Sequence, residues 1–240
     1  MMKINNWLFN IQSFFYPPHC VLCGAKVLAA GAGMDLCAGC QSALPENEHA
    51  CVRCGIPFES ELEAATCGQC LHEPPAFDRC LALYRYQAPL DSLITRLKFH
   101  HRLAIARLLA ALMQQKIEAL ESLPDAILPV PLHPSRLRER GFNQALEIAR
   151  PIAGALNIPL LLQHCERTRA TVMQSSLPAR QRSRNVKGVF RVVRAIPYQH
   201  VAIVDDVMTT GETVRELAKV LRAAGVPRID VWVVARAPLN

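Results

Sequence analysis

Apolar residues follow two different spacings in the part of the chain beyond residue 75. Short, continuously apolar runs indicate strands that are buried on both faces, and they cover residues 80–87, 125–132, 158–165, 188–193, 200–206 and 228–236. Apolar residues at helical spacing cover residues 88–99, 103–123, 142–156 and 213–225. Because strands and helices alternate, the pattern predicts an α/β fold with a parallel sheet covered on both faces. Pro151, inside the third helical segment, predicts a break or kink there.

The N-terminal part of the chain lacks these periodic segments. It is loop-rich, and one short helix with an apolar face is expected, over residues 7–15. We place a domain boundary near Pro74–Pro75, between a small cysteine-rich domain of residues 1–75 and an α/β domain of residues 76–240. Polar residues interrupt the first apolar run and no small-residue cleavage site follows it, so no signal peptide is predicted. No run reaches about 18 apolar residues, so no transmembrane helix is predicted.

Eight of the ten cysteines form four CxxC pairs in two units. The units leave 13 and 12 residues between their pairs, and the eight cysteines are Cys20, Cys23, Cys37, Cys40, Cys51, Cys54, Cys67 and Cys70. Four thiolates suit a structural Zn²⁺ ion, which replaces the core that so short a segment lacks. The spacing therefore predicts two zinc sites, against the alternatives of an iron–sulfur cluster or redox dithiols. Pairing in sequence order is the prediction, although spacing alone also allows an interleaved arrangement.

Composition changes this picture only a little. The formal net charge of +7 favours an anionic partner, which could be a phosphorylated metabolite, a nucleic acid or a membrane surface. The hydrophobic fraction of 51% is enough for a packed core. Metal-binding rather than disulfide-forming cysteines are typical of a reducing compartment, so a cytoplasmic location is expected.

The stretch VAIVDDVMTTGETV, residues 201–214, combines a buried strand, two carboxylates and a hydroxyl-rich turn before a helix. A helix N-terminus with free N–H groups favours a phosphate in that turn. Asp205 and Asp206 would repel a phosphate placed directly beside them. They suit the hydroxyls of a sugar whose phosphate lies one sugar length away, in the turn. A Walker B strand is excluded because the chain has no Gly-Lys dipeptide for a phosphate loop. The remaining alternative is a threonine-capped helix with the aspartates on the surface.

This stretch resembles the phosphoribosyl pyrophosphate (PRPP) motif of type I phosphoribosyltransferases. The stretches PVPLHPSRLRERGFNQALEIA and TRATVMQSSLPARQRSRNVKGVF, behind four CxxC pairs, resemble the ComF family, which includes proteins called GntX. The resemblance spans almost the whole chain. It implies a Rossmann-like type I phosphoribosyltransferase domain, with a parallel sheet, behind a double zinc ribbon. It also implies that Asp205 and Asp206 orient the ribose for catalysis, and that the 5′-phosphate is bound by Met208, Thr209, Thr210, Gly211, Glu212 and Thr213.

The same resemblance gives roles to two basic segments. Arg138, Arg140 and Gly141 would contact pyrophosphate, whose oxygens suit the several donors of Arg, with a solvated loop as the alternative. Residues 166–187 would form a flexible hood that closes over PRPP. Its residues of interest are Arg167, Arg169, Gln174, Arg180, Arg182, Arg184, Asn185 and Lys187. Lys98 is a weaker match to the family, with a surface lysine as the alternative, and Asn143 and Gln144 belong to the family motif without an assigned role.

The activity implied by the resemblance is a pentosyltransferase reaction that uses PRPP and Mg²⁺. The residues do not identify the acceptor. The alternatives are ammonia or an amine, and a nucleobase. Because ComF proteins are linked to competence and DNA use, the resemblance implies a role in DNA uptake or in the use of imported DNA and nucleotide salvage. Single-stranded DNA and DNA-uptake proteins are the further partners implied. The alternative is a zinc-ribbon protein that binds single-stranded DNA and uses PRPP as a regulatory ligand without turnover.

Overall fold

The computed structural model describes residues 18–27, 34–59, 65–100, 102–170 and 187–238. The chain forms two compact units, residues 1–44 and residues 45–240. No helix among the described residues has both the length and the apolar character needed to cross a membrane.

The described residues of the first unit, 18–27 and 34–44, are organised around four cysteines. Within them, one antiparallel bridge joins His19 to Lys26, and the Val21 N–H donates to the Asp35 carbonyl at 2.9 Å. The short helix α2 (Ala38–Ser42) follows Cys37, the first cysteine of the second CxxC pair. Limited regular structure in these residues is what a metal-held segment without a large core is expected to show.

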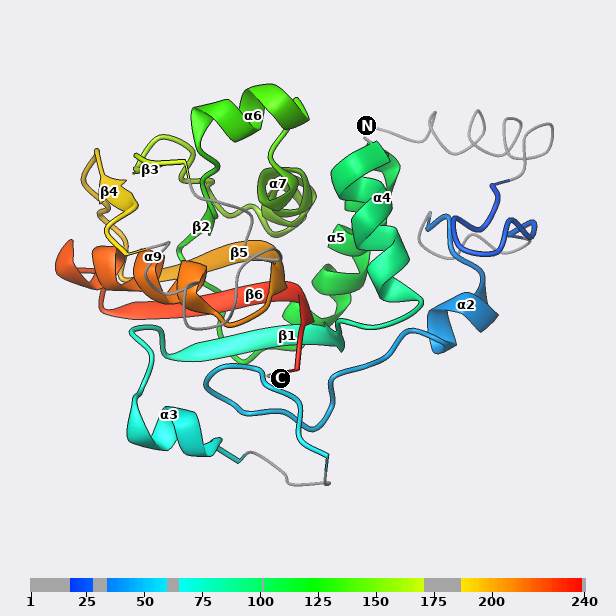
Figure 1. Ribbon diagram of the computed structural model, residues 1–240, viewed down its shortest axis with the longest axis horizontal. Coiled ribbons are helices and arrows are strands. Elements are labelled where there is room, and N and C mark those ends of the chain that lie inside the picture. The colour runs from blue at the N-terminus through cyan, green and yellow to red at the C-terminus, as the bar shows by residue number, and fades with distance from the viewer. Residues whose placement is uncertain (1–17, 28–33, 60–64, 101, 171–186, 239–240) are drawn as a thin grey trace, which may run out of the picture. The chain divides into compact units, whose positions relative to one another are not determined.

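The second unit contains a four-stranded parallel sheet in the order β1-β6-β5-β2 (Figure 1). Every pair is parallel, with Val204 opposite both Pro129 and Trp232. The strands are β1 (Arg79–Arg85), β2 (Ala126–Pro129), β5 (His200–Met208) and β6 (Arg228–Arg236). The predicted parallel α/β sheet is therefore confirmed. Because parallel strands end at the same edge, Met208, Pro129 and Arg236 lie at one carboxyl edge.

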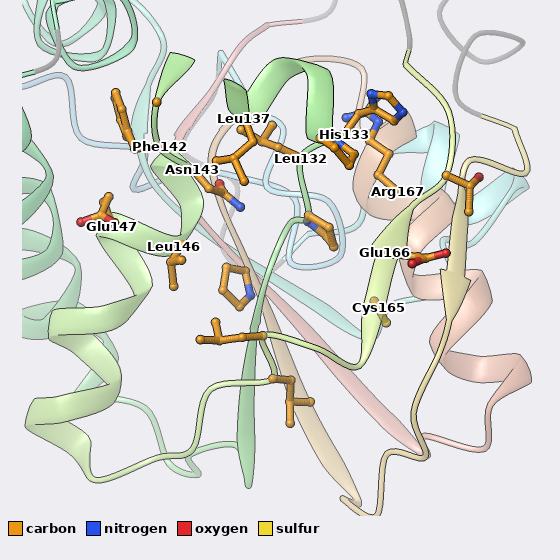
Figure 2. Close-up of a pocket in the computed structure, with 17 residues that line it drawn as sticks. Leu132, His133, Leu137, Phe142, Asn143, Leu146, Glu147, Cys165, Glu166 and Arg167 are labelled. Carbon is orange, nitrogen blue, oxygen red and sulfur yellow. The ribbon is translucent and has the colours of Figure 1, made fainter. Parts of the chain in front are cut away.

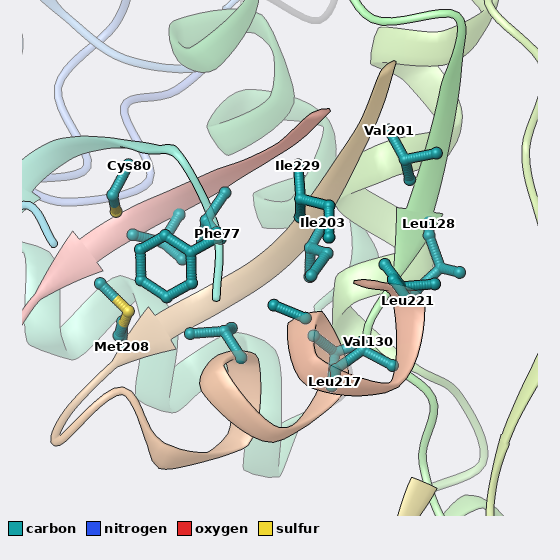
Figure 3. Close-up of a cluster of buried hydrophobic side chains, with 14 of the residues drawn as sticks. Phe77, Cys80, Leu128, Val130, Val201, Ile203, Met208, Leu217, Leu221 and Ile229 are labelled. Atoms are coloured by element: carbon teal, nitrogen blue, oxygen red, sulfur yellow. The ribbon is translucent and has the colours of Figure 1, made fainter. Parts of the chain in front are cut away.

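Helices cover both faces of this sheet. Val201 and Ile203 pack in a buried cluster with Leu217 and Leu221 of one helix (Figure 3). Ala202, between them, is also fully buried and points to the opposite face, where α7 contacts β5 and β2. The helices are α4 (Leu90–His100), α5 (Leu103–Ile117), α7 (Gln144–Leu156) and α9 (Glu212–Ala223).

Three smaller elements are also described in the second unit. A two-stranded antiparallel sheet pairs β3 (Cys165–Arg167) with β4 (Phe190–Val192). The short helix α6 (Pro134–Arg140) occupies the segment that was expected to be a pyrophosphate loop. It begins at His133, whose ring nitrogen accepts from the Ser135 N–H, and ends at Gly141, so the segment carries its own helix start and stop. The third element is α3 (Gly68–His72), which follows Cys67.

The strand expected over residues 158–165 was wrong, and of the break or kink expected at Pro151 the break does not occur. Before Cys165, which begins β3, this run makes one bridge, between Leu160 and Ile127, because Pro159 has no N–H to donate. Strand β3 then begins at Cys165. No break occurs at Pro151, and α7 continues to Leu156. Residues on both sides of the proline are buried, so their packing outweighs the roughly 3 kcal/mol that an internal proline costs.

The second group of cysteines belongs to the same compact unit as the sheet. Cys51, Cys54 and Cys70 lie in one buried cluster with Phe77 and Ile229. Compactness thus divides the chain between Leu44 and Pro45. The boundary near Pro74–Pro75 stays a prediction drawn from composition.

Candidate functional site: two tetracysteine clusters and a sugar-phosphate site

The eight paired cysteines form two clusters, and each cluster uses its cysteines in sequence order. The ligand atoms of each set lie within 4.8 Å of one another. The first cluster is Cys20, Cys23, Cys37 and Cys40, and the second cluster is Cys51, Cys54, Cys67 and Cys70. The predicted sequential pairing is confirmed. Gly55, directly after Cys54, has a φ of +67°, a conformation that glycine reaches without strain and that closes the knuckle turn.

The thiols of the second cluster shift one another's pKa values. Burial alone would raise the pKa of Cys51, but backbone N–H groups, including that of Cys67 at 3.3 Å, lower this pKa to about 7. Burial and then the charge of Cys51 raise the pKa of the neighbouring Cys54 to about 11. Several thiols held this close resist joint ionisation unless a cation binds between them. Both clusters are consistent with structural zinc sites.

The two carboxylates of the predicted sugar-phosphate site lie near the end of β5. Asp205 Oδ1 accepts the Asp206 N–H at 2.9 Å, and Asp206 Oδ1 accepts the Val207 N–H at 2.9 Å. These bonds fix both side chains to the strand end. Asp206 is buried, and its Oδ2 lies 2.7 Å from the Lys98 ammonium at the end of α4. The alternative of Lys98 as a free surface lysine is thereby excluded.

The environment of the acid pair controls its ionisation. Burial, followed by the charge of Asp206, raises the pKa of Asp205 from its ordinary 3.8 to about 7, while Lys98 acts in the opposite direction. Burial would lower the pKa of Lys98, but Asp206 and Asp205 outweigh it and raise that pKa. The Lys98 ammonium therefore opposes the rise in the pKa of Asp205 that burial and the Asp206 charge cause.

The turn after the acid pair provides donors for an anion. Gly211 adopts a φ of +82° and is the N-cap of α9, where it offers no side-chain acceptor of its own to the first N–H groups of this helix. The Thr210 hydroxyl is buried and makes no hydrogen bond to any residue in the described part of the chain. Buried hydroxyls are almost always paired. A small cavity lined by Asp205, Thr209 and Thr213, among others, runs beside this turn.

Two arginines lie within the electrostatic field of the acid pair. Burial lowers the pKa of Arg140, and the charges of Asp206 and Asp205 partly restore it. Arg167 in β3 responds in the same way to burial and to Asp205. Arg138 is exposed on α6. The structure therefore brings Arg140 and Arg167 near the carboxylates. Arg167 lies in strand β3 and not in a loop. Its guanidinium carbon lies 5.5 Å from the centre of the Phe190 ring.

A pocket of about 590 Å³ lies beside the carboxyl edge of β2 (Figure 2). Pro129 and Pro131 line it together with leucines, and Glu147 from α7 faces Glu166 and Arg167 from β3 across it. Asn143 has a structural role here, since its Nδ2 donates to the Val130 carbonyl and its Oδ1 accepts the Ala145 N–H, both at 3.0 Å. It thereby ties the start of α7 to the end of β2.

Several expected hood residues fall outside the described residues, and these are Gln174, Arg180, Arg182, Arg184 and Asn185. The two ends of that segment are described. Arg169 donates to the Lys187 carbonyl at 2.9 Å, and the Gly188 N–H donates to Glu216 of α9 at 2.6 Å. These bonds hold the ends of the segment together and against α9, the helix that follows the predicted phosphate-binding turn.

Sequence reasoning missed Arg236, the last residue of β6. Its side chain is 2% exposed, and its guanidinium donates to the carbonyls of Cys54, Met208, Thr209 and Ala237. The sequence did contain a signal for Arg236. Strand β6 is strongly apolar and ends in a charged residue, as the apolar run before Asp205 and Asp206 does. It lacked any neighbouring motif to draw attention to it.

Replacing Lys98 by Met is expected to shift the pH dependence of sugar-phosphate binding. Lys98 lowers the pKa of Asp205, so its loss raises this pKa further above about 7. Affinity for ribose 5-phosphate should then fall at a higher pH than in the wild type. Calorimetric titrations over a pH series measure this midpoint. Lys116→Met, which removes an exposed lysine paired with Glu46, is the control, and equal midpoints in all three proteins would contradict the role of Lys98.

Three kinds of comparison with known proteins gave matches. A model of the double zinc ribbon domain matches residues 11–71. Competence protein F of Haemophilus influenzae is 37% identical over 231 residues, which cover 93% of this chain and 99% of that protein. DNA utilization protein YhgH of Salmonella typhimurium is 36% identical over 225 residues, which cover 92% and 97%. Among solved structures, a glutamine PRPP amidotransferase from B. subtilis, complexed with ADP and GMP, aligns with 54% of this chain and 26% of that chain, at 21% identity and a TM-score of 0.38.

Proposed function

The chain belongs to the family of competence protein F and DNA utilization protein YhgH, and from this premise we propose that it binds PRPP and transfers its phosphoribosyl group. The observation that carries the proposal is the order of groups along β5 and α9. Two fixed carboxylates are followed within a few residues by a glycine turn and an uncapped helix N-terminus. A ribose with a phosphate on its 5′-carbon presents hydroxyls and an anion in the same order.

In this account each part of PRPP has its own partner. Asp205 accepts hydrogen bonds from the ribose hydroxyls through Oδ2, and Asp206 accepts through its own Oδ2, which it shares with the Lys98 ammonium. The turn from Met208 to Thr213 receives the 5′-phosphate, including a bond from the Thr210 hydroxyl. Arg140, which lies in the field of both acids, and Arg138 on the same helix receive the pyrophosphate, whose oxygens suit the fork of donors that Arg presents.

Mg²⁺ is the expected companion of PRPP. The two carboxylates face one ammonium, that of Lys98, so the oxygen-rich site retains negative charge that suits a hard cation. Asp205 and Asp206 are the residues that would hold the ion with the pyrophosphate. When bound, Mg²⁺ supplies neutralisation of the charge that develops on the departing pyrophosphate.

The reaction that fits these groups is displacement at C1 of the ribose. The bond from C1 to the pyrophosphate oxygen breaks, and that oxygen keeps the electron pair. A nitrogen of the acceptor then donates its lone pair to C1 and later releases its proton. The sugar passes through a cationic state, as in glycoside chemistry, and the nearby Asp205 and Asp206 carboxylates stabilise that charge. Catalysis therefore rests on positioning and electrostatics rather than on a nucleophilic side chain.

The pocket beside β2 is the place for the acceptor. It opens at the carboxyl edge next to β5, and Arg167 lines it. The charge of Asp205 raises the pKa of the same Arg167, against the effect of burial. Its apolar prolines and leucines suit a ring, and Glu147 and Glu166 can accept from ring or amino N–H groups. In a family of competence and DNA utilization proteins, the transferred group would serve DNA uptake, the use of imported DNA or nucleotide salvage.

Thr210→Val tests the phosphate half of the site. The variant keeps the shape of the side chain and removes the donor, so ribose 5-phosphate should bind with a loss of roughly 1–3 kcal/mol. Isothermal titration calorimetry measures the change, and Thr95→Val on an exposed part of α4 is the matched control. Unchanged affinity in Thr210→Val, with binding to the wild type intact, would remove this hydroxyl from the site.

A second candidate function is binding of single-stranded nucleic acid, and one surface feature favours it. Phe99 is 57% exposed at the end of α4, and the Arg140 guanidinium lies 5.8 Å from its ring centre. An exposed ring beside arginines is a platform on which bases stack while phosphates pair with the cations. The names of the relatives, which refer to competence and DNA utilization, support this second candidate.

Phe99→Ala is expected to weaken binding of single-stranded oligonucleotides by about 1–3 kcal/mol, similarly for different sequences. Binding by the wild type should weaken steeply as salt rises, because phosphate contacts release counterions. Fluorescence anisotropy at several salt concentrations measures both effects. Leu71→Ala, which truncates an exposed apolar residue on α3, is the control. Salt-insensitive or sequence-selective binding would contradict this candidate.

A further inference from the structure

A buried arginine joins the second cluster to the turn of the sugar-phosphate site. Arg236 Nε donates to the Cys54 carbonyl at 3.1 Å, and Nη1 donates to the Met208 carbonyl at 3.1 Å and to the Thr209 carbonyl. Cys54 supplies a ligand of the second cluster. Met208 and Thr209 begin the turn. One side chain therefore contacts both features, and it does so from the buried end of β6.

The cysteine side of this connection is held rigidly. The carbonyl of Gly55, next to Cys54, accepts from Asn47 Nδ2 at 2.9 Å. A side chain at Gly55 would meet Ala82 and Cys80 of β1 at 3.0 and 3.1 Å, so the knuckle lies directly on the sheet. With its four sulfurs fixed by a metal, the second cluster holds the Cys54 carbonyl in one place.

The charge of Arg236 strengthens the connection. Its four acceptors are all backbone carbonyls, and no carboxylate among the described residues forms an ion pair with it. A buried cation that has only dipoles as partners is costly. A divalent ion with four thiolates carries a formal charge of about −2. The loaded second cluster is thus the counter-charge that lets the guanidinium stay buried under the turn.

We propose that metal in the second cluster sets the position of the Met208–Thr209 segment through Arg236, so that metal binding and sugar-phosphate binding stabilise each other. The proposal rests on the proposed sugar-phosphate site and adds a role for the metal beyond holding a small fold together. Arg236 is a positioning residue in this account and touches no substrate. The first cluster belongs to the other compact unit, and every described partner of Arg236 lies in residues 45–240.

Reciprocity makes the proposal testable without any activity assay. If metal raises the affinity for the ligand, the ligand must raise the affinity for the metal by the same factor. The Cys40→Ser variant lacks a ligand of the first cluster, so its remaining zinc reports on the second cluster alone. Transfer of that zinc to a coloured chelator is measured with and without saturating ribose 5-phosphate. We expect the ligand to slow the transfer by about fivefold or more, as for a coupling of typical size.

The same assay in Cys40→Ser/Arg236→Met separates this connection from general stabilisation by the ligand. Methionine fills space but donates no hydrogen bond, so the ligand effect on zinc release should disappear, and Arg236→Lys should restore part of it. Cys40→Ser/Arg107→Met, which removes an exposed arginine of α5, should keep the full effect.

Each outcome decides the matter. If ribose 5-phosphate binds but does not slow zinc release from Cys40→Ser, the coupling is wrong while the sugar-phosphate site stands. If the Arg236→Met protein is folded and shows the same slowing, the coupling does not run through Arg236. If Arg236→Met does not fold, Arg236→Lys is the deciding variant. Slowing of zinc release by ribose 5-phosphate that is as large in Arg236→Lys as with the native arginine would overturn the specific role of the guanidinium. Absence of ribose 5-phosphate binding to the wild type would overturn the site and the coupling together.

Discussion

At about pH 8, Asp205→Asn is expected to make the protein more stable and its ligand binding weaker. The folded protein raises the pKa of Asp205 from 3.8 to about 7. An acid with a raised pKa destabilises the fold as pH rises from its unfolded to its folded pKa, and the full cost is present above the folded value. Each pKa unit corresponds to about 1.4 kcal/mol, and partial exposure reduces the total, so a gain on the order of 1–3 kcal/mol is expected.

The variant preserves the local structure, because Asn keeps the Oδ1 acceptor for the Asp206 N–H. Affinity for ribose 5-phosphate should nevertheless fall about tenfold or more, since a charged acceptor for a sugar hydroxyl is lost. Thermal unfolding at several pH values and calorimetry measure the two effects. Below the ordinary pKa of an aspartate the stability difference should vanish. Glu121→Gln, at an exposed position, is the control. A variant that is less stable than the wild type at high pH would contradict the electrostatic account of this site.

Removal of one cysteine from each cluster is expected to have very unequal effects. Cys51 and Cys20 are the first ligands of their clusters and are almost equally buried, at 1% and 3%. Each Ser variant should lose one of two zinc ions. Metal binding at such a site contributes about 10–16 kcal/mol in small zinc domains, which exceeds the usual stability of a whole domain. Because the second cluster belongs to the core of the sheet unit, Cys51→Ser should unfold that unit.

Cys20→Ser removes metal from the first unit only, so the main unfolding transition, which belongs to the sheet unit, should stay within about 1 kcal/mol of the wild type, as for sites that share no partners. Metal analysis of the purified proteins and thermal melts followed by circular dichroism check both statements. Equal destabilisation by the two variants would contradict the assignment of the second cluster to the sheet unit. Bound iron with visible absorbance, or no metal at all, would contradict zinc at both sites.

The features that sequence could predict are those that depend on local pattern. Continuous apolar runs predicted parallel strands because a strand buried on both faces needs apolar side chains at successive positions. Strand β6 matches its predicted range of residues 228–236. The CxxC spacing predicted two clusters because a tetrahedral ion needs two pairs of thiolates. The carboxylates at the end of β5 stood out because a buried strand rarely ends in two acids.

The features that sequence could not predict depend on which distant segments meet. Lys98 on α4 reaches Asp206 across more than a hundred residues, and nothing near it in the chain signals a buried acid. Arg236 connects Cys54 to Met208 in the same way. The run at 158–165 failed as a strand because pairing depends on the partner's N–H groups and on Pro159, whereas apolar pattern reports burial alone. Helix α6 was missed because its seven residues carry too few apolar side chains to show a period.

The central claim is that the end of β5 and the following turn bind a ribose phosphate, and calorimetric titration of PRPP with Mg²⁺ into two proteins tests it most directly. The proteins are the wild type and the double variant Asp205→Asn with Asp206→Asn, which keeps both side-chain shapes and removes both charges. The account predicts binding to the wild type, competition by ribose 5-phosphate, and at least about a hundredfold loss of affinity in the double variant, as for two charged hydrogen bonds. Equal PRPP affinity in the two proteins would show that Asp205 and Asp206 do not contact the ribose.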